Sequence, residues 1–250
     1  MLKKEIIVDR IKQRLDIYKK KKNKNGIEYS IDMYERQLKY YKNEICKKEL
    51  IIQTNIEKVE NIMIVAHPDD ETIFGFNELH NTDKKWLLIV CSNSIDGRIG
   101  VLRKDIPGLI QMSKDYSFNL VVIEHFDISE ERIINARVDK KVYNYLKKYL
   151  LKQEWNKVIT HNKDGEYGHS YHIIVHRMVS NILYNNQVRY KKFKVFDFDD
   201  KNNNDYLIVK RIIKKYYLMA GDHLLELKCD KVCTKNEEPM NYDMTNVLCE

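Results

Sequence analysis

A short run of side chains able to bind a metal or move protons follows an apolar segment in the first third of the chain. It reads His67-Pro68-Asp69-Asp70-Glu71. Imidazole and carboxylate groups are common ligands of catalytic zinc, and the same groups act as general acids and bases. Pro68 fixes the local backbone and removes one hydrogen-bond donor. These residues are therefore the first candidates for a reactive site.

A second run of the same chemical kind comes about a hundred residues later. It contains His161, Gly165, Gly168, His169 and His172. The two glycines predict a tight loop. The last two histidines are three positions apart, which places them on one face of a helix that begins there. Two such clusters, each following an apolar run, are hard to explain as ordinary solvated loops.

The combined inventory matches a catalytic zinc site. Such a site has three protein ligands, here two imidazoles and one carboxylate, and keeps one position open for water. Carboxylate and imidazole groups remain in surplus for acid–base work. Zinc lowers the pKa of bound water towards about 7, which makes hydroxide available at neutral pH. We therefore expect Zn2+ as the cofactor of a hydrolase that needs no acyl-enzyme.

The elements that must position these residues alternate between strands and helices. Apolar runs typical of buried strands occupy residues 61–66, 86–91, 120–123 and 157–160. Helices are expected between them and from about His169 onward. This order predicts an α/β fold with a Rossmann-like, mostly parallel sheet and helices on both faces. Ligands bind beyond the carboxyl ends of such strands, so the two clusters are expected to converge.

The two ends of the chain differ from this central pattern. Residues 1–57 are expected to form a basic helical hairpin, whose apolar seam packs on the main domain or on a second copy of the chain as a homo-oligomer. The first 50 residues hold 15 Lys/Arg and 8 Asp/Glu, which equals the whole net charge of +7. The remaining chain is neutral, so no nucleic-acid partner is expected. Beyond residue 185 the pattern weakens: residues 193–198 alternate like a strand, and residues 212–218 fit a helix or a strand.

Composition also predicts where the protein acts. The longest apolar run, Trp86 to Cys91, is far shorter than the roughly 20 residues that span a bilayer, so no membrane span is expected. The first residues mix acids and bases where a secretory signal needs an unbroken apolar stretch. Five cysteines without disulfide-framework spacing suit a reducing compartment. We expect a cytoplasmic protein.

The motifs carry a resemblance to a known family. A strand followed by AHPDDE, with GEYGHxxH about a hundred residues on, resembles the LmbE-like/PIG-L family of zinc-dependent N-deacetylases. These enzymes remove an acetyl group from N-acetylglucosamine units. The resemblance covers roughly His67 to Arg177. It implies a deacetylase domain over residues 58–250, with a divergent part from 185 onward.

The resemblance also implies a role for each motif residue. It implies His67, Asp70 and His172 as the zinc ligands. Asp69 matches the general base, and His169 matches the residue that stabilises the tetrahedral intermediate. Glycolipid deacetylases of this family in eukaryotes are usually membrane-anchored, and no anchor is expected here. The implied partner is therefore an N-acetylated amino sugar in soluble form, such as a sugar nucleotide, a glycoside or a glycan.

The residues that would bind the sugar depart from the family pattern. Many members have Arg-x-x-Glu-Leu after the second strand. Arg98 and Arg103 are the candidates here, but Ile106 stands where the glutamate would follow Arg103. His161, at the end of the fourth strand, is expected either to contact substrate or support the ligands, or to be structural. Residues 216–219 carry no convincing equivalent of the family's His-x-Ser-Gln segment.

Two other functions are open on the residues alone. Asp69 and Asp70 could hold magnesium or manganese for phosphoryl or glycosyl transfer, although hard cations prefer oxygen ligands and this site is rich in imidazole. The chain could also be a non-catalytic sugar-binding relative, although the presence of Asp69 argues against it. His176 lies one turn after His172, where a fourth ligand would close the open position. Tightly bound zinc would favour the hydrolase.

Overall fold

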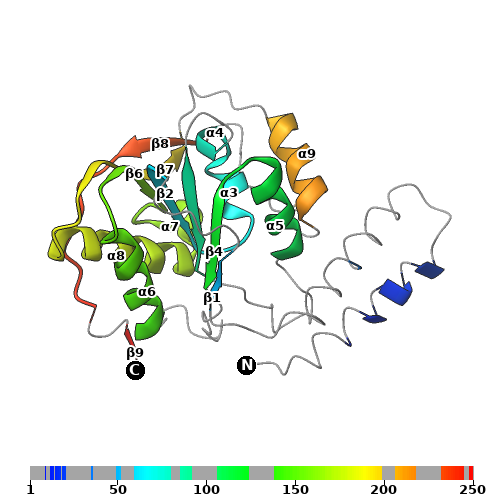
Figure 1. Ribbon diagram of the computed structural model, residues 1–250, viewed down its shortest axis with the longest axis horizontal. Coiled ribbons are helices and arrows are strands. Elements are labelled where there is room, and N and C mark those ends of the chain that lie inside the picture. The colour runs from blue at the N-terminus through cyan, green and yellow to red at the C-terminus, as the bar shows by residue number, and fades with distance from the viewer. Residues whose placement is uncertain are drawn as a thin grey trace.

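The fold is described from a computed structural model of the chain (Figure 1). The described residues are 9, 12–13, 15–17, 19–20, 35, 49–51, 59–79, 85–91, 106–123, 138–198, 206–217, 232–244 and 248–249.

A mixed, mostly parallel sheet forms the centre of the described chain. Its seven described strands lie in the order β1-β4-β3-β2-β6-β7-β8. The five inner strands run parallel, whereas β1 and β8 pair antiparallel at the two edges. The strands are β1 (Glu49–Ile51), β2 (Asn61–Val65), β3 (Trp86–Val90), β4 (Asn119–Ile123), β6 (Trp155–Thr160), β7 (Tyr190–Phe198) and β8 (Val232–Asn236). A separate pair joins β5 (Val138–Asp139) to β9 (Leu248–Cys249).

Helices cover both faces of this sheet, which is why every residue of β2 and β3 is buried (Figure 1). The described helices are α3 (Asp70–Ile73), α4 (Phe76–Leu79), α5 (Ile106–Asp115), α6 (Lys140–Leu150), α7 (Gly165–Gly168), α8 (Ser170–Asn185) and α9 (Tyr206–Tyr216). Residues of α6 and α8, such as Leu146 and Val179, pack on one face. Residues of α3, α4, α5 and α9 pack on the other. The two apolar cores are separated by the sheet.

The winding of the sheet reverses at β2. From β2 the chain continues to β3 and β4 on one side, and it later returns to place β6 on the other side of β2. The loops after β2 and β6 therefore leave neighbouring strands in opposite directions. Open α/β sheets bind their ligands in the crevice at this point. The first candidate cluster follows β2, and the second follows β6.

The predicted α/β fold with a mostly parallel sheet and helices on both faces is confirmed. The segment at residues 212–218, which the sequence fits as a helix or a strand, lies largely in helix α9. Val138, which fits the apolar spacing of the following helix, instead lies in β5, because its backbone pairs with Leu248.

The predicted helical hairpin in residues 1–57 lies mostly outside the described residues. It stays a prediction, together with the contact between copies assigned to it. At its end, Glu49–Ile51 forms β1 and pairs with β4, so the main sheet begins before residue 58. Among the described helices, none combines the length and apolar character needed to cross a membrane.

The segment after β8 is fixed onto α8 by side-chain hydrogen bonds. Asn181 Nδ2 donates to the carbonyl of Tyr242 at 2.7 Å, and its Oδ1 accepts from Tyr143 OH at 2.7 Å. Met240 N donates to Ser180 Oγ at 2.6 Å.

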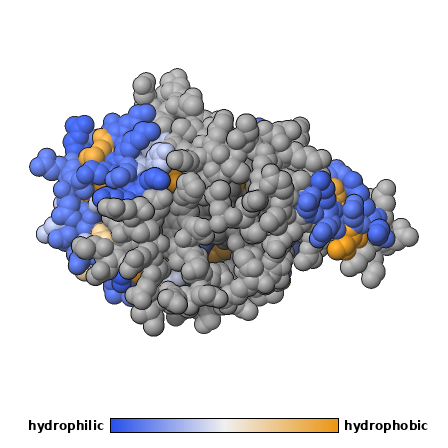
Figure 2. All heavy atoms as spheres, turned by 90° about the horizontal axis from the view of Figure 1, so that it is seen from below, coloured by the Kyte–Doolittle hydropathy of each residue, from blue (hydrophilic) through white to orange (hydrophobic). Residues whose placement is uncertain are grey.

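On the face seen in Figure 2, the described surface residues are mainly hydrophilic, with isolated apolar side chains among them.

Candidate metal centre

The loops after β2 and β6 bring the two clusters together, as the sequence predicts. Asp70 is the first residue of α3, and His172 lies in the first turn of α8. His172 Nε2 is 3.3 Å from Asp70 Oδ1. His67 Nδ1 is 3.2 Å from Asp70 Oδ2, and the backbone N–H of His67 donates to the same oxygen at 2.7 Å. The three residues expected to bind zinc are therefore in mutual contact through Asp70.

Four imidazoles surround this carboxylate. The ring centroids of His161 and His172 are stacked 3.8 Å apart, and those of His169 and His172 are 4.5 Å apart. His67 meets His169 edge-on at 4.9 Å. Two groups of described residues have donor atoms spaced to hold a metal ion: His67, His169 and His172, and Asp70, His161 and His172. His172 belongs to both.

Glu166 supports this cluster from below, a role that the sequence analysis did not assign. Its Oε2 lies 2.5 Å from His172 Nδ1 and 3.0 Å from His161 Nδ1, and its side chain is fully buried. Its Oε1 accepts the N–H of Asn162 at 2.9 Å. Burial alone would raise the pKa of Glu166, but the charge and hydrogen bonds of the two histidines lower it to about 2. The carboxylate is thus ionised and accepts from both rings.

The loop between β6 and α8 is shaped to place Glu166 there. Gly165 and Gly168 have φ values of 67° and 87°, which glycine adopts without a Cβ clash. Glu166 itself has φ 58° and ψ −61°, a conformation that a residue with a side chain rarely adopts. Such strain persists only where surrounding contacts hold it. The two glycines of the GEYG motif are the sequence feature that could have predicted this tight loop.

His161 is held at both ring nitrogens. Its Nε2 accepts the backbone N–H of Ala66 at 3.0 Å, so the proton of the neutral ring is on Nδ1, which donates to Glu166. Its ring is fully buried. Of the roles open from the sequence, this geometry fits a support for the loop after β2 and for Glu166. It leaves no exposed surface for a substrate contact.

The charges of the centre favour a cation. Burial would lower the pKa of His172, but the charge of Asp70 and the contacts with Glu166 raise it to about 9. Burial would raise the pKa of Asp70, yet the charges of His172 and His67 hold it well below the ordinary range. His172 Nε2 is buried and lies 3.3 Å from Asp70 Oδ1, without hydrogen-bond geometry to any described residue. Because Nδ1–H donates to Glu166, Nε2 is the nitrogen that would give up its proton to bind a metal.

The donor set therefore fits a metal ion. A buried imidazole whose other nitrogen donates to a carboxylate is the usual arrangement of a metal-ligating histidine. Nitrogen-rich sites favour zinc and other transition metals over magnesium or calcium. The expected metal centre is supported to this extent: Asp70, His161 and His172 form a buried group with suitable spacing.

Asp69 and Glu71 lie on either side of Asp70 and are also buried. Glu71 Oε2 accepts the N–H of Asp69 at 3.0 Å, and its Oε1 accepts from Tyr217 OH at 2.5 Å. Burial raises the pKa of Glu71 to about 7, against the hydrogen bonds from Tyr217 and Asp69 that lower it. Asp69 has φ 127° and ψ −29°. Its backbone is thus held by a buried carboxylate two residues away.

His169 and Tyr167 lie closer to the protein surface than the other residues of the centre. His169 is half-buried and precedes α8. Tyr167 is 51% exposed, and its ring is 5.6 Å from that of His169 and 5.5 Å from that of His172. Tyr167 is a second residue of the motif that the sequence analysis left without a role. Arg98 and Arg103, the expected sugar contacts, lie outside the described residues.

His176 lies one turn below His172 but faces away from the centre. Its Nδ1 bonds to the carbonyl of His161 at 2.9 Å, and its Nε2 is 3.2 Å from Tyr242 OH. Burial lowers the pKa of His176 to about 4, so its ring is neutral. Both ring nitrogens have partners outside the centre, so His176 does not act as a fourth ligand in this arrangement.

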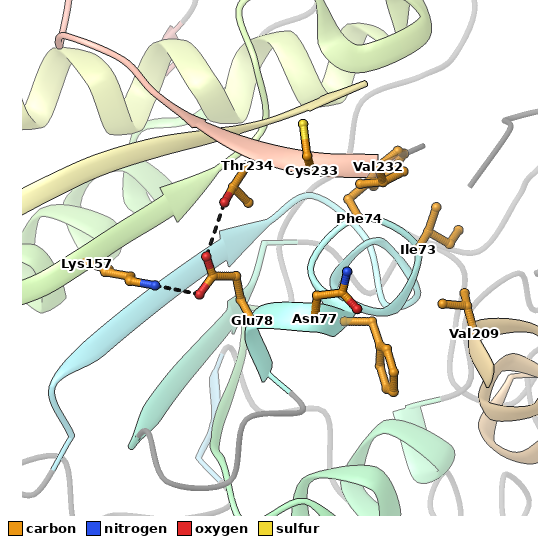
Figure 3. Close-up of a pocket in the computed structure, with 10 residues that line it drawn as sticks. Ile73, Phe74, Asn77, Glu78, Lys157, Val209, Val232, Cys233 and Thr234 are labelled. Carbon is orange, nitrogen blue, oxygen red and sulfur yellow. Dashed lines mark hydrogen bonds and ion pairs between the residues drawn. The ribbon is translucent and has the colours of Figure 1, made fainter. Parts of the chain in front are cut away.

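A separate pocket of about 300 Å³ lies between α4, α9 and β8 (Figure 3). Its polar side is an ion pair between Glu78 Oε2 and Lys157 Nζ at 2.7 Å, and Thr234 Oγ1 donates to Glu78 Oε1 at 3.2 Å. Phe74 forms part of its wall and also packs near His172, with ring centroids 5.8 Å apart. The cluster of histidines does not line this pocket.

Comparison with known proteins gives one similarity and no functional assignment. No family model matches the chain. The chain is similar to "Uncharacterized protein L374" of Acanthamoeba polyphaga mimivirus, with 29% identity over 196 residues, which cover 74% of this chain and 79% of that protein. The relative carries no described activity in its name, so function has to be inferred from the site.

Proposed function

We propose that this chain is a zinc-dependent hydrolase that removes the N-acetyl group from an N-acetylglucosamine-type sugar. Its main support is the separation of two neighbouring carboxylates. Asp70 belongs to a group with metal-ligand spacing and Asp69 does not, although both side chains are buried. A metal-dependent hydrolase needs this division, with one carboxylate to hold the metal and another to move a proton.

The metal would be held by His67, Asp70 and His172. Glu166 orients the last of these by accepting a hydrogen bond from its Nδ1–H at 2.5 Å. His161 shares the metal-spaced group of Asp70 and His172, but it is assigned a supporting role because its Nε2 accepts the Ala66 N–H. A zinc ion bound there supplies a Lewis acid that polarises an amide carbonyl and lowers the pKa of water.

The chemical step would be carried by Asp69 and His169. Asp69 accepts a proton from the attacking water and passes it towards the leaving amine, as a general base and then a general acid. His169 lies 4.5 Å from His172 between ring centroids and is less buried than the ligands. A protonated His169 donates a hydrogen bond to the carbonyl oxygen, which becomes negatively charged when water adds to the amide carbon.

The exposed side of the centre suits a sugar. Tyr167 presents an exposed aromatic ring beside His169, and ligand sites commonly combine such rings with a few fixed polar groups. The strand order β4-β3-β2-β6-β7 supports the Rossmann-like topology expected from the alternation of strands and helices, with the centre at its switch point. We infer a small acetylated sugar, such as a sugar nucleotide, a glycoside or a glycan fragment.

The four imidazoles argue against the rival transferase. Magnesium and manganese sites for phosphoryl transfer are built mainly from oxygen ligands. The ring of His172 lies in direct contact with the only carboxylate that the metal-spaced groups of described residues contain. A nitrogen-rich donor set of this kind fits hydrolysis with zinc better.

The substrate is tested by a screen. Purified zinc-loaded protein is incubated with N-acetylhexosamine derivatives, and released acetate and free amine are measured. We expect both products from at least one N-acetylglucosamine derivative. Binding of a sugar without acetate release would instead identify a non-catalytic sugar-binding protein. Absence of acetate from every derivative, with zinc bound, would refute the substrate class.

The residue roles are tested by zinc content and turnover in four variants. Asp70→Asn and His172→Ala should lose zinc and activity together, because each removes a ligand. Asp69→Asn and His169→Ala should keep zinc, and Asp69→Asn should lose about 10²–10⁴-fold in turnover if general-base catalysis contributes its usual share. Loss of the metal from Asp69→Asn would reverse the roles of the two aspartates.

A further inference from the structure

Asp69 has a backbone conformation that needs outside support. Its φ of 127° and ψ of −29° lie in a region that residues with a Cβ rarely occupy. α3 follows at once, and the Asp69 carbonyl accepts from Ile73 N at 2.8 Å. Strained residues of this kind persist where the surrounding structure over-determines them, and they gather at functional sites.

The N–H of Asp69 is held by Glu71, which is completely buried. Among the described residues, its side chain accepts from three donors: Asp69 N to Oε2 at 3.0 Å, Thr72 Oγ1 to Oε1 at 2.7 Å and Tyr217 OH to Oε1 at 2.5 Å. A carboxylate that only accepts is stabilised in its ionised form by these bonds. Tyr217 is thus one of the donors that hold Glu71 in place under the loop.

Tyr217 reaches this position from a distant part of the chain. It follows α9, which packs against α3 and α5, and its side chain is 3% exposed. Tyr217 N donates to the Ile213 carbonyl at 2.7 Å, which continues the helical bonding of α9 and fixes the tyrosine. The C-terminal part of the chain thereby contacts the first motif from beneath.

We propose that Glu71 and Tyr217 are positioning residues that fix the backbone of Asp69, and so place its carboxylate for proton transfer. This role rests on the proposed function, in which Asp69 is the general base. Their hydrogen bonds go to the Asp69 N–H, to Thr72 and to each other, so their loss should affect turnover rather than zinc content. The alternative is that Tyr217 only satisfies a buried carboxylate and stabilises the fold.

The test compares Tyr217→Phe with Tyr216→Phe. The two tyrosines are neighbours, and each donates its hydroxyl to a carboxylate at 2.5 Å, but Tyr216 bonds to Asp115 at the edge of α5. Glu71→Gln, which keeps the shape and removes the charge, is the second variant. The first measurement is amide hydrogen exchange of Asp69 in protein labelled with 15N-aspartate, which needs neither substrate nor metal.

We expect Tyr217→Phe and Glu71→Gln to exchange the Asp69 amide about tenfold faster or more, as expected for weakening one charge-assisted hydrogen bond, while Tyr216→Phe matches the wild type. In the zinc-loaded protein, kcat for the sugar from the screen should fall by a similar factor, with KM and zinc stoichiometry unchanged. Unchanged Asp69 exchange in Tyr217→Phe would overturn the proposal. Tyr217→Phe that exchanges the Asp69 amide faster, or melts at a lower temperature, but keeps the full kcat would also overturn the proposal. If the wild type cleaves no acetylated sugar, the proposed function fails, and the exchange data alone still decide whether Glu71 and Tyr217 hold Asp69.

Discussion

Replacing Glu166 by Gln is expected to weaken zinc binding while leaving every assigned ligand in place. Glu166 uses one oxygen to accept from His161 and His172, and the other to accept from Asn162 N. Glutamine has the same shape but only one accepting oxygen, because the other position becomes an NH2 group. The substitution therefore changes hydrogen bonding without opening a cavity.

The magnitude follows from the two ways the amide can lie. If its oxygen faces the histidines, the NH2 group opposes the N–H of Asn162, which then loses its acceptor. If its NH2 group faces the histidines, Nδ1 of His172 must become an acceptor. The ring proton then moves to Nε2, the nitrogen assigned to the metal. Loss of such a supporting partner lowers metal affinity by about 10–100-fold.

The assay is a competitive zinc titration against a chromophoric chelator at fixed pH. Glu78→Gln is the matched control, because Glu78 is a partly buried carboxylate that pairs with Lys157 and Lys194 away from the histidines. We expect a zinc Kd raised about 10–100-fold in Glu166→Gln and unchanged in Glu78→Gln. A zinc Kd within twofold of the wild type in folded Glu166→Gln would refute the orienting role.

Three further outcomes are expected. Glu78→Gln should lower the free energy of unfolding at pH 7 by about 1–3 kcal/mol. Burial would raise the pKa of Glu78, but Lys157 holds that pKa below 4.5. The stabilisation is therefore present above pH 4.5 and is lost as the pH falls below it. Denaturant unfolding of wild type and variant should show a smaller difference in unfolding free energy at about pH 3.5 than at about pH 7. Zinc at about 100 times its Kd should stabilise the fold by about 2.7 kcal/mol, seen as a melting temperature roughly 5–10 °C higher that a chelator reverses, whereas equal magnesium should not. Asn181→Ala removes the donor to the Tyr242 carbonyl and the acceptor of Tyr143 OH. It should lower the free energy of unfolding in urea by about 1–3 kcal/mol. A loss below about 0.5 kcal/mol would show that other contacts hold the segment after β8.

The central sheet could be predicted because its signal is local. The runs NIMIV and WLLIV are buried on both faces, and such strands read as continuous apolar segments. The convergence of His67 and His172 also follows from order along the chain, since parallel strands end at one edge. The edge strand β1 was not predicted, because its three residues carry no distinct pattern and pair only through tertiary contact.

The supporting residues of the site could not be read in the same way. Glu166 acts through a loop conformation with φ of 58°, which no propensity of glutamate predicts. Tyr217 meets Glu71 across 146 positions of sequence, and its neighbour Tyr216 has the same side chain with a different partner. Local pattern identifies which residues carry chemistry, whereas the contacts that orient them depend on the packed fold.

The two aspartates show how the fold separates identical side chains. Asp70 begins α3, and its carboxylate is drawn towards His67 and His172. Asp69, one residue earlier, is turned by its φ of 127° and held at its N–H by Glu71. The difference therefore lies in the backbone and not in the two side chains, which are chemically identical. The division between a metal ligand and a proton acceptor would instead fail when the contacts beneath the loop are lost, even with both aspartates present.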